Sequence, residues 1–424
     1  MNIKKTTAIF ASTVLVLGFA VGNCFISTKI QTADASEPKV VDAYVNYGNG
    51  EFTYTVYSDN HVEICNGSKS KTISELTIPA KIDGKTVTEI DWYAFSENKN
   101  LTEVTLPNTL VDIGTGAFQE CTALKSVKIP DSVQTIEDYA FMGDVALRDV
   151  SVSKKFANAG DSIFSKCIAL ETVEISDGAI VIGESMFSDC RSLTKVTVPD
   201  SVKTIGKYAF DGCGKIESIN IPKTLSMINE STFRNCKSLK SITIPETVMG
   251  IEENAFMGCS LIENVNIPKS VSEIGYGAFG DCANLKSITI NNPSCDIYSL
   301  SSTICNAVVN YESKYNGLVV YGYRGSTAQK WVENYYYEKG LSFSALDGLF
   351  GDVNNDNKVD SKDAVLILKS YAENLAGVKT NIDKSVADVN GDGNVDSKDA
   401  VIVLKYYAET LTGFSGGIES YLKK

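Results

Sequence analysis

Apolar residues recur through the middle of this chain with a period of 23 residues. Within each period, which we call a coil, apolar side chains occupy positions 1, 4, 6, 10, 13, 17, 18 and 21. The most regular position holds phenylalanine, and nine phenylalanines are each 23 residues apart: Phe95, Phe118, Phe141, Phe164, Phe187, Phe210, Phe233, Phe256 and Phe279. An unbroken period of this length predicts a solenoid, in which coils stack and equivalent side chains form ladders.

The pattern inside a coil predicts its local structure. Positions 3 to 6 alternate between polar and apolar residues, as in Ser241–Ile244, which is typical of a half-buried strand. A proline follows and ends this strand in six coils, at Pro107, Pro130, Pro199, Pro222, Pro245 and Pro268. The segment Ala-Phe-x-x-Cys predicts a short helical or 3₁₀ turn. We therefore expect one strand, one bend and one tight turn in each coil.

Changes in this pattern divide the chain into seven segments. They are a leader at 1–35, an N-terminal cap at 36–75, the coils at 76–290, a C-terminal cap at 291–345, a linker at 346–350, a second module at 351–413 and a tail at 414–424. The C-terminal cap is expected to contain a helix capped by Ser326. Trp331 on this helix is expected to pack on the last coil; the alternative is a ligand platform formed with Tyr335–Tyr337.

Seven cysteines belong to the repeat, because each lies three residues after a ladder phenylalanine: Cys121, Cys167, Cys190, Cys213, Cys236, Cys259 and Cys282. Asn98 and Asp144 fill this position in the other two coils. Equivalent side chains on stacked coils point in parallel directions, which is poor geometry for a disulfide. We expect buried free thiols that fill the core. Cys295 and Cys305 lie beyond the regular coils, and the sequence leaves open whether they pair.

The N-terminus has the features of a secretory signal, since Lys4 and Lys5 precede an apolar run and Ala33-Asp34-Ala35 fits a cleavage site. We expect an exported protein without a membrane span. The net charge of −13 disfavours nucleic-acid binding, which needs clustered cations. The chain has a single histidine, His61, and no recurring catalytic pair, so we expect no enzyme activity.

Two similar loops follow the coils, and both have the oxygen spacing of a calcium site. Positions 1, 3, 5, 7, 9 and 12 are Asp352, Asn354, Asp356, Lys358, Asp360 and Asp363 in the first loop, and Asp388, Asn390, Asp392, Asn394, Asp396 and Asp399 in the second. Ca²⁺ takes six or more hard oxygen ligands, and position 7 supplies its main-chain carbonyl. Each loop enters an apolar helix. The sequence therefore predicts two bound calcium ions.

Position 12 is aspartate in both loops, and one helix follows each loop, so residues 351–413 resemble type I dockerins, the docking modules of cellulosomal proteins. The resemblance implies a cohesin partner on a scaffold protein. In that family, loop positions 10 and 11 and a basic residue further along the helix contact the cohesin. The matching residues here are Ser361, Lys362 and Lys369, and Ser397, Lys398 and Lys405. Their identity in both halves indicates a module with two docking orientations.

The coils at 76–290 resemble the BspA-like leucine-rich repeats of bacteria, and with the C-terminal cap the resemblance covers residues 76–345. Together the two resemblances imply an α/β-type leucine-rich solenoid of nine 23-residue coils, followed by a small all-α dockerin of two loop-helix units. They also imply a secreted, non-catalytic protein that associates with the cell surface through its scaffold, with the solenoid binding a protein or surface ligand. The alternative is a polysaccharide-degrading or -modifying enzyme that carries a dockerin.

Overall fold

The computed structural model of the chain describes residues 38–48, 50–66, 70–152, 158–175, 177–309, 312–335, 338–346, 350–354, 356, 358–414 and 417–422. The predicted leader, Tyr336, Tyr337 and the centre of the predicted linker lie outside these residues.

Short strands make up most of the described chain. They are β1 (Val40–Tyr47), β2 (Phe52–Tyr57), β3 (His61–Cys65), β4 (Glu75–Thr77), β5 (Lys81–Ile82), β6 (Lys85–Ile90), β7 (Glu103–Thr105), β8 (Asp112–Ile113), β9 (Ser126–Lys128), β10 (Thr135–Ile136), β11 (Asp149–Val152), β12 (Asn158–Ala159), β13 (Thr172–Ile175), β14 (Val181–Ile182), β15 (Lys195–Thr197), β16 (Thr204–Ile205), β17 (Met227–Ile228), β18 (Gly250–Ile251), β19 (Asn264–Ile267), β20 (Glu273–Ile274), β21 (Ser287–Ile290), β22 (Asp296–Ile297), β23 (Ala307–Val309), β24 (Glu312–Lys314), β25 (Leu318–Gly322) and β26 (Leu341–Ala345). The helices are η1 (Ser301–Thr303), α1 (Thr327–Asn334), α2 (Ser361–Leu375), α3 (Lys384–Ala387), α4 (Ser397–Leu411) and α5 (Ile418–Leu422).

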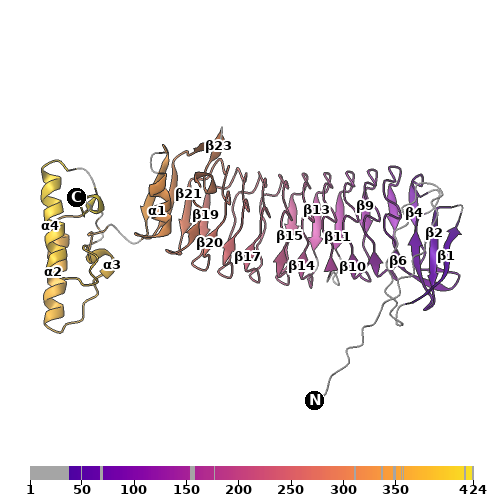
Figure 1. Cartoon of the computed structure of the whole chain (residues 1–424), viewed down its shortest axis with the longest axis horizontal. Helices are drawn as coiled ribbons and strands as arrows, with labels where there is room; N and C mark the ends of the chain where they lie inside the picture. The colour runs from indigo at the N-terminus through magenta and orange to yellow at the C-terminus, as the bar shows by residue number, and fades with distance from the viewer. Residues whose placement is uncertain are drawn as a thin grey trace, which may run out of the picture.

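The predicted solenoid is confirmed, with coils stacked along the long axis of the molecule (Figure 1). One column of parallel strands, which we call the sheet face, contains β4, β7, β9, β11, β13 and β15 and resumes at β19 and β21. From β7 onward, paired residues in it are 23 positions apart, as in Val150 and Val173; β4 and β7 pair at a spacing of 28. The prediction of a strand at Ser241–Ile244 is wrong, because the main chain there forms no hydrogen-bonded pairing with a neighbouring strand.

A second column of parallel strands was not expected from the sequence. It runs from β6 to β12, resumes as β14 and β16, and resumes again from β17 to β22. After β6 its strands are two residues long and end at the apolar residue of coil position 13, as in β8, β18 and β20. Partners again lie one coil apart, as in Ile251 and Ile274. Two residues give too short an alternation to be recognised as a strand in a sequence.

The nine ladder phenylalanines form one continuous stack through the core. Consecutive ring centroids lie 5.2 to 5.8 Å apart, and neighbouring rings deviate from parallel by at most 15°. None of these side chains is more than 1% exposed. Phe52 of the N-terminal cap covers the first ring, Phe95, edge to face at 6.5 Å, and Tyr47 stacks on Phe52 at 4.5 Å. Aromatic packing therefore extends into the cap.

The segment around each ladder phenylalanine is not the helical or 3₁₀ turn that the sequence predicted. The residues two before and two after the phenylalanine are left-handed, with φ between 52° and 77° in all nine coils, for example Ser185 and Asp189 around Phe187. Alternate N–H groups then point to different partners. Phe187 N donates to Ala209 O of the next coil at 2.9 Å, whereas Ser188 N donates to Ser185 O of its own coil at 3.0 Å. The turns thus form a third hydrogen-bonded column between coils.

The seven repeat cysteines are buried free thiols, as expected, but they do more than fill space. Each Sγ donates to the carbonyl oxygen of the ladder phenylalanine in the preceding coil, at 3.1 to 3.4 Å. Burial raises the pKa of these thiols. Cys295 and Cys305, whose pairing the sequence left open, are also free.

Asp144 occupies the cysteine position of its coil and is fully buried. Its Oδ1 accepts a hydrogen bond from Cys121 N at 2.8 Å, and its Oδ2 has no hydrogen-bond partner. Burial raises the pKa of this carboxyl well above its usual range. The protonated acid is therefore the form that suits this core position.

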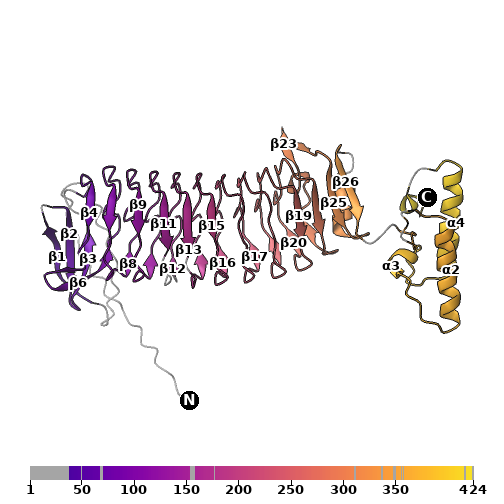
Figure 2. The ribbon, with the colours of Figure 1, turned by 180° about the vertical axis from the view of Figure 1, so that it is seen from behind.

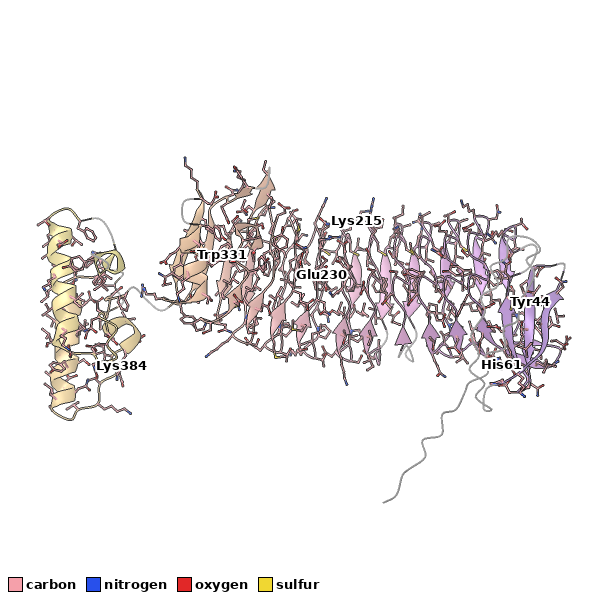
Figure 3. The ribbon with its side chains drawn as sticks, viewed as in Figure 1. Tyr44, His61, Lys215, Glu230, Trp331 and Lys384 are labelled. Atoms are coloured by element: carbon pink, nitrogen blue, oxygen red, sulfur yellow. The ribbon has the colours of Figure 1, made fainter. Side chains whose placement is uncertain are left out.

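Both ends of the solenoid are closed by irregular elements. At the N-terminal end, β1–β3 pair in antiparallel fashion, and Asp83 (φ 51°) and Gly84 (φ 78°) form the turn between β5 and β6. At the other end, Ser326 caps α1 by accepting from Gln329 N at 3.2 Å, as predicted. Trp331 packs on the last coil, 3% exposed, and its Nε1 donates to Tyr298 O at 3.3 Å (Figure 3).

Helices α2 and α4 pack together beyond β26 (Figure 2). Their fully buried apolar residues are Ala364, Ile367, Ala400 and Val403. The expected C-terminal tail contains α5, and its Ile418 joins this core, 2% exposed. No described helix is both long and apolar enough to cross a membrane.

Candidate functional site

The two predicted loop-helix units have the same local conformation. Asp360 caps α2 with φ −137° and ψ −170°, and Asp396 caps α4 with φ −138° and ψ −170°. In both, the aspartate three residues on, Asp363 or Asp399, completes a reciprocal capping box. The repeated Asp-Ser-Lys-Asp sequence therefore specifies the same helix start twice.

The aspartate at position 12 organises each loop. Asp363 is fully buried, and its two oxygens accept from Val353 N (2.8 Å), Asn354 N (3.2 Å) and Asp360 N (2.8 Å). Burial raises the pKa of Asp363, and these N–H groups oppose that effect. In the second loop, the carboxylate of Asp399 accepts hydrogen bonds from Asn390 N at 3.0 Å and from Asp396 N at 2.9 Å.

The remaining loop oxygens fit a calcium ion. Asp352 is only 2% exposed, and the buried Oδ1 of its counterpart, Asp388, has no hydrogen-bond partner. Such an oxygen needs a cation or a donor, because an unpaired buried carboxylate is costly. Gly393 (φ 84°) makes the turn at position 6 of the second loop; its counterpart Asn357 lies outside the described residues.

A calcium ion would bind the side-chain oxygens of positions 1, 3, 5, 9 and 12 and the carbonyl of position 7, the twelve residues predicted from the sequence. It would supply positive charge among four carboxylates in each loop. In the described part of the chain, no three ligand oxygens from the four aspartates of one loop lie within 4.8 Å of one another.

Lys362 and Lys398, predicted as cohesin contacts, lie over the loops. Lys362 Nζ is 3.6 Å from Asp356 and 3.7 Å from Asp360, and Lys398 Nζ lies 3.5 and 3.6 Å from the equivalent aspartates. Both side chains are about 70% exposed, so they remain accessible to a partner. Lys369 is 3.9 Å from Glu373 and is also exposed.

The structure adds apolar residues to the predicted docking surface. Val365 (62%) and Leu368 (41%) are exposed on α2, and Val401 (46%) and Leu404 (41%) are exposed on α4. They lie one turn and two turns after the Ser-Lys pairs, on the same helix faces. We call each set of serine, two lysines, valine and leucine a docking face. The same valine and leucine occur in both repeats, and this repetition could have identified them from the sequence.

A second polar cluster lies in the N-terminal cap, where Glu63, Cys65 and Asp91 bring three ligand atoms within 4.8 Å of one another. Thr55 Oγ1 lies 3.4 Å from Cys65 Sγ, and burial raises the pKa of Cys65 to about 12. A thiol of this kind resists the deprotonation that metal binding requires. His61 is half-buried, and its Nδ1 lies 2.5 Å from Asp59 Oδ1 (Figure 3). The polar cluster of Glu63, Cys65 and Asp91 therefore lacks the features of a metal site.

Two family models match the chain. A BspA type leucine-rich repeat region matches in six copies over residues 88–217 and 203–310. A dockerin type I domain matches residues 350–407. No curated protein matches the chain.

Several solved structures are similar. A leucine-rich repeat protein of T. pallidum is 27% identical, with 51% of this chain and 90% of that chain covered and a TM-score of 0.38. A leucine-rich repeat protein of Bacteroides ovatus is 21% identical, with coverages of 71% and 99% and a TM-score of 0.34. A leucine-rich cell surface protein of Faecalibacterium prausnitzii is 23% identical, with coverages of 64% and 97% and a TM-score of 0.31.

Proposed function

Because the chain belongs to the BspA-type leucine-rich repeat family and ends in a type I dockerin domain, we propose that it is a secreted, non-catalytic protein that docks onto cohesins of a cellulosome scaffold. Dockerins of this type bind calcium and have cohesin partners. The solenoid then presents an interaction or adhesion surface from the assembly. This would place the protein outside the cell, at the cell surface where its scaffold is attached.

The observation that carries the proposal is the duplication of the docking face. The helix starts agree to within 1° in φ, and the two faces have the same serine, lysine, valine and leucine residues. Exposed valine and leucine side chains next to cations suit a partner surface with apolar and acidic groups. Either face is therefore able to meet the same cohesin, and calcium in the loops would hold both helix starts in place.

Calorimetry with a recombinant cohesin, in calcium and in chelator, tests the proposal. We expect one cohesin per chain in calcium and no binding in chelator. Binding that is undiminished in chelator would contradict a calcium-dependent dockerin.

The rival function, an enzyme carried by the dockerin, has less support. The matched domains are of non-catalytic kinds, and the described part of the chain has one histidine, held by Asp59 in the cap. A screen of the full-length protein against plant polysaccharides tests this rival directly. Release of reducing sugar that is absent from a mock preparation would favour it.

A further inference from the structure

The sheet face of the solenoid opens at one place. It is continuous from β4 to β15 and resumes at β19, but the two intervening coils contribute no strand. No main-chain hydrogen bond joins Lys195–Val198 to Ser218–Ile221, or Ser218–Ile221 to Ser241–Ile244, all of which are described residues. One side chain bridges the first gap: Asn220 Nδ2 donates to Val198 O at 2.5 Å, and Val198 N donates to Asn220 Oδ1 at 3.1 Å.

The opening forms a groove of about 660 Å³ across three coils. Its polar lining includes the ammonium groups of Lys195 and Lys223, the amide of Asn220 and the hydroxyls of Ser218, Ser241 and Thr243. The main chains of the three separated segments, Lys195–Val198, Ser218–Ile221 and Ser241–Ile244, border the same space. Main-chain groups that lack a protein partner are satisfied by water or by a ligand.

The charge of the groove is opposite to that of the chain. No aspartate or glutamate lines it, although the net charge of the protein is −13. The outward positions of the sheet face include Glu103, Asp149 and Glu174 in the N-terminal coils but no carboxylate from Lys195 through β21.

The acidic residues beside the groove are either neutralised or outside it. Glu217 is paired with Lys240 at 2.7 Å. Asp200 and Glu246 occupy the same coil position as Lys223 in the adjacent coils but are not part of the lining. Lys195 and Lys223 form no ion pair with any described residue, so both cations are available to a ligand.

We propose that this groove binds an extended acidic segment of a partner protein, whose carboxylates pair with Lys195 and Lys223. Hydroxyl and amide side chains and the free main-chain groups would then satisfy the peptide bonds of the segment. A sugar chain fits less well, because no aromatic ring lines the groove for stacking. The ladder rings of the three coils lie 5.7 and 5.4 Å apart. At about 3.3 Å per residue, roughly three to five extended residues would cross the opening. The proposal rests on the proposed role of the solenoid as an interaction module and names its binding site.

Fluorescence anisotropy with the full-length protein in calcium tests the proposal. The probe is a fluorescein-labelled eight-residue peptide of alternating Glu and Thr, and the matched peptide has Gln in place of Glu. The test variant is Lys195→Glu with Lys223→Glu. The control is Lys128→Glu, an exposed lysine on the same sheet face but outside the groove. All three substituted side chains are exposed, and thermal melts check that the variants fold alike.

We expect the Glu peptide to bind the wild type at least tenfold tighter than the Gln peptide does. The double variant should lose at least tenfold in affinity, and the control should stay within twofold of the wild type. Equal binding of the two peptides, an equal loss in Lys128→Glu, or no binding of the Glu peptide would overturn the proposal. Binding of polygalacturonate in place of the peptide would overturn it in favour of an acidic glycan.

Cohesin binding by the double variant separates this proposal from the function on which it rests. If the groove proposal fails while calcium-dependent cohesin binding persists, docking stands and the solenoid binds elsewhere or not at all. If the wild type itself does not bind cohesin in calcium, the proposed docking function is wrong.

Discussion

The thiol of Cys213 donates a hydrogen bond to the carbonyl oxygen of Phe187, 3.1 Å away in the preceding coil. The same contact occurs at every repeat cysteine, so the phenylalanine stack and the cysteine column hold each coil to the one before it. Since a coil contacts only its neighbours, loss of one such layer should weaken the whole array.

Substitution of a central ladder residue tests the stack. Phe187→Ala removes a fully buried ring with parallel neighbours at 5.8 and 5.5 Å, and we expect a loss of about 3–5 kcal/mol in the free energy of unfolding. Chemical denaturation followed by fluorescence or circular dichroism measures this. Leu261→Ala, at a side chain 40% exposed, should cost far less. If the two changes lower the free energy of unfolding equally, the stacked rings do not stabilise the solenoid as proposed.

Thiol labelling tests the cysteine column. The folded protein should react slowly with a thiol reagent even near pH 9, because burial raises the thiol pKa, to about 12 for Cys65 and Cys295. After denaturation without reductant, at least seven thiols should react. A count below seven would show that repeat cysteines are oxidised.

Asp144 should make the solenoid more stable in mild acid than at neutral pH. Its folded pKa lies well above its usual range, whereas the unfolded carboxyl titrates near 3.9. The unfolded chain therefore releases the proton first, and stability falls as the pH rises above about 4 towards the folded pKa.

Asp144→Asn should remove this dependence and stabilise the protein at pH 7 by about 1–3 kcal/mol. Melts of the wild type and the variant at pH 5 and pH 7 measure the effect, with Asp131→Asn, an exposed residue, as the control. A variant that is less stable at pH 7, or a difference that does not change with pH, would argue against a buried acid.

Single ligand changes test the calcium loops. Asp352→Asn or Asp388→Asn should each lower the stoichiometry of calcium binding from two to one in calorimetry, because position 1 contributes a carboxylate oxygen. Asn394→Ala is the matched control, since position 7 supplies only its main-chain carbonyl. Loss of a calcium ion in that control would mean that the predicted ligand set is wrong.

Paired changes test the two docking faces. Ser361→Ala with Lys362→Ala should weaken cohesin binding little, because Ser397 and Lys398 offer an equivalent face. Changing both pairs should weaken binding far more than the sum of the separate effects. Leu368→Ala with Leu404→Ala should also weaken it, since both side chains are 41% exposed. Complete loss from the first pair alone would indicate one fixed orientation.

The sequence by itself determined which side chains enter the core. A strict period of 23 places Phe187 or Cys213 in the same surroundings in every coil, so one pattern predicts nine layers. It also predicted the cap at Ser326 and an apolar helix after each calcium loop, because these features depend on a few adjacent residues. It did not predict that the two helices begin at Ser361 and Ser397.

Only the tertiary structure decided how the coils bond to one another. The left-handed residues around Phe187, the two-residue strands and the opening beside Asn220 all concern main-chain groups that meet across a coil boundary. Periodicity reports which face a side chain takes, but not whether adjacent backbones approach closely enough to pair. That distance follows from the packing of whole layers, and here it separates Ser218–Ile221 from the coils on either side and leaves a groove.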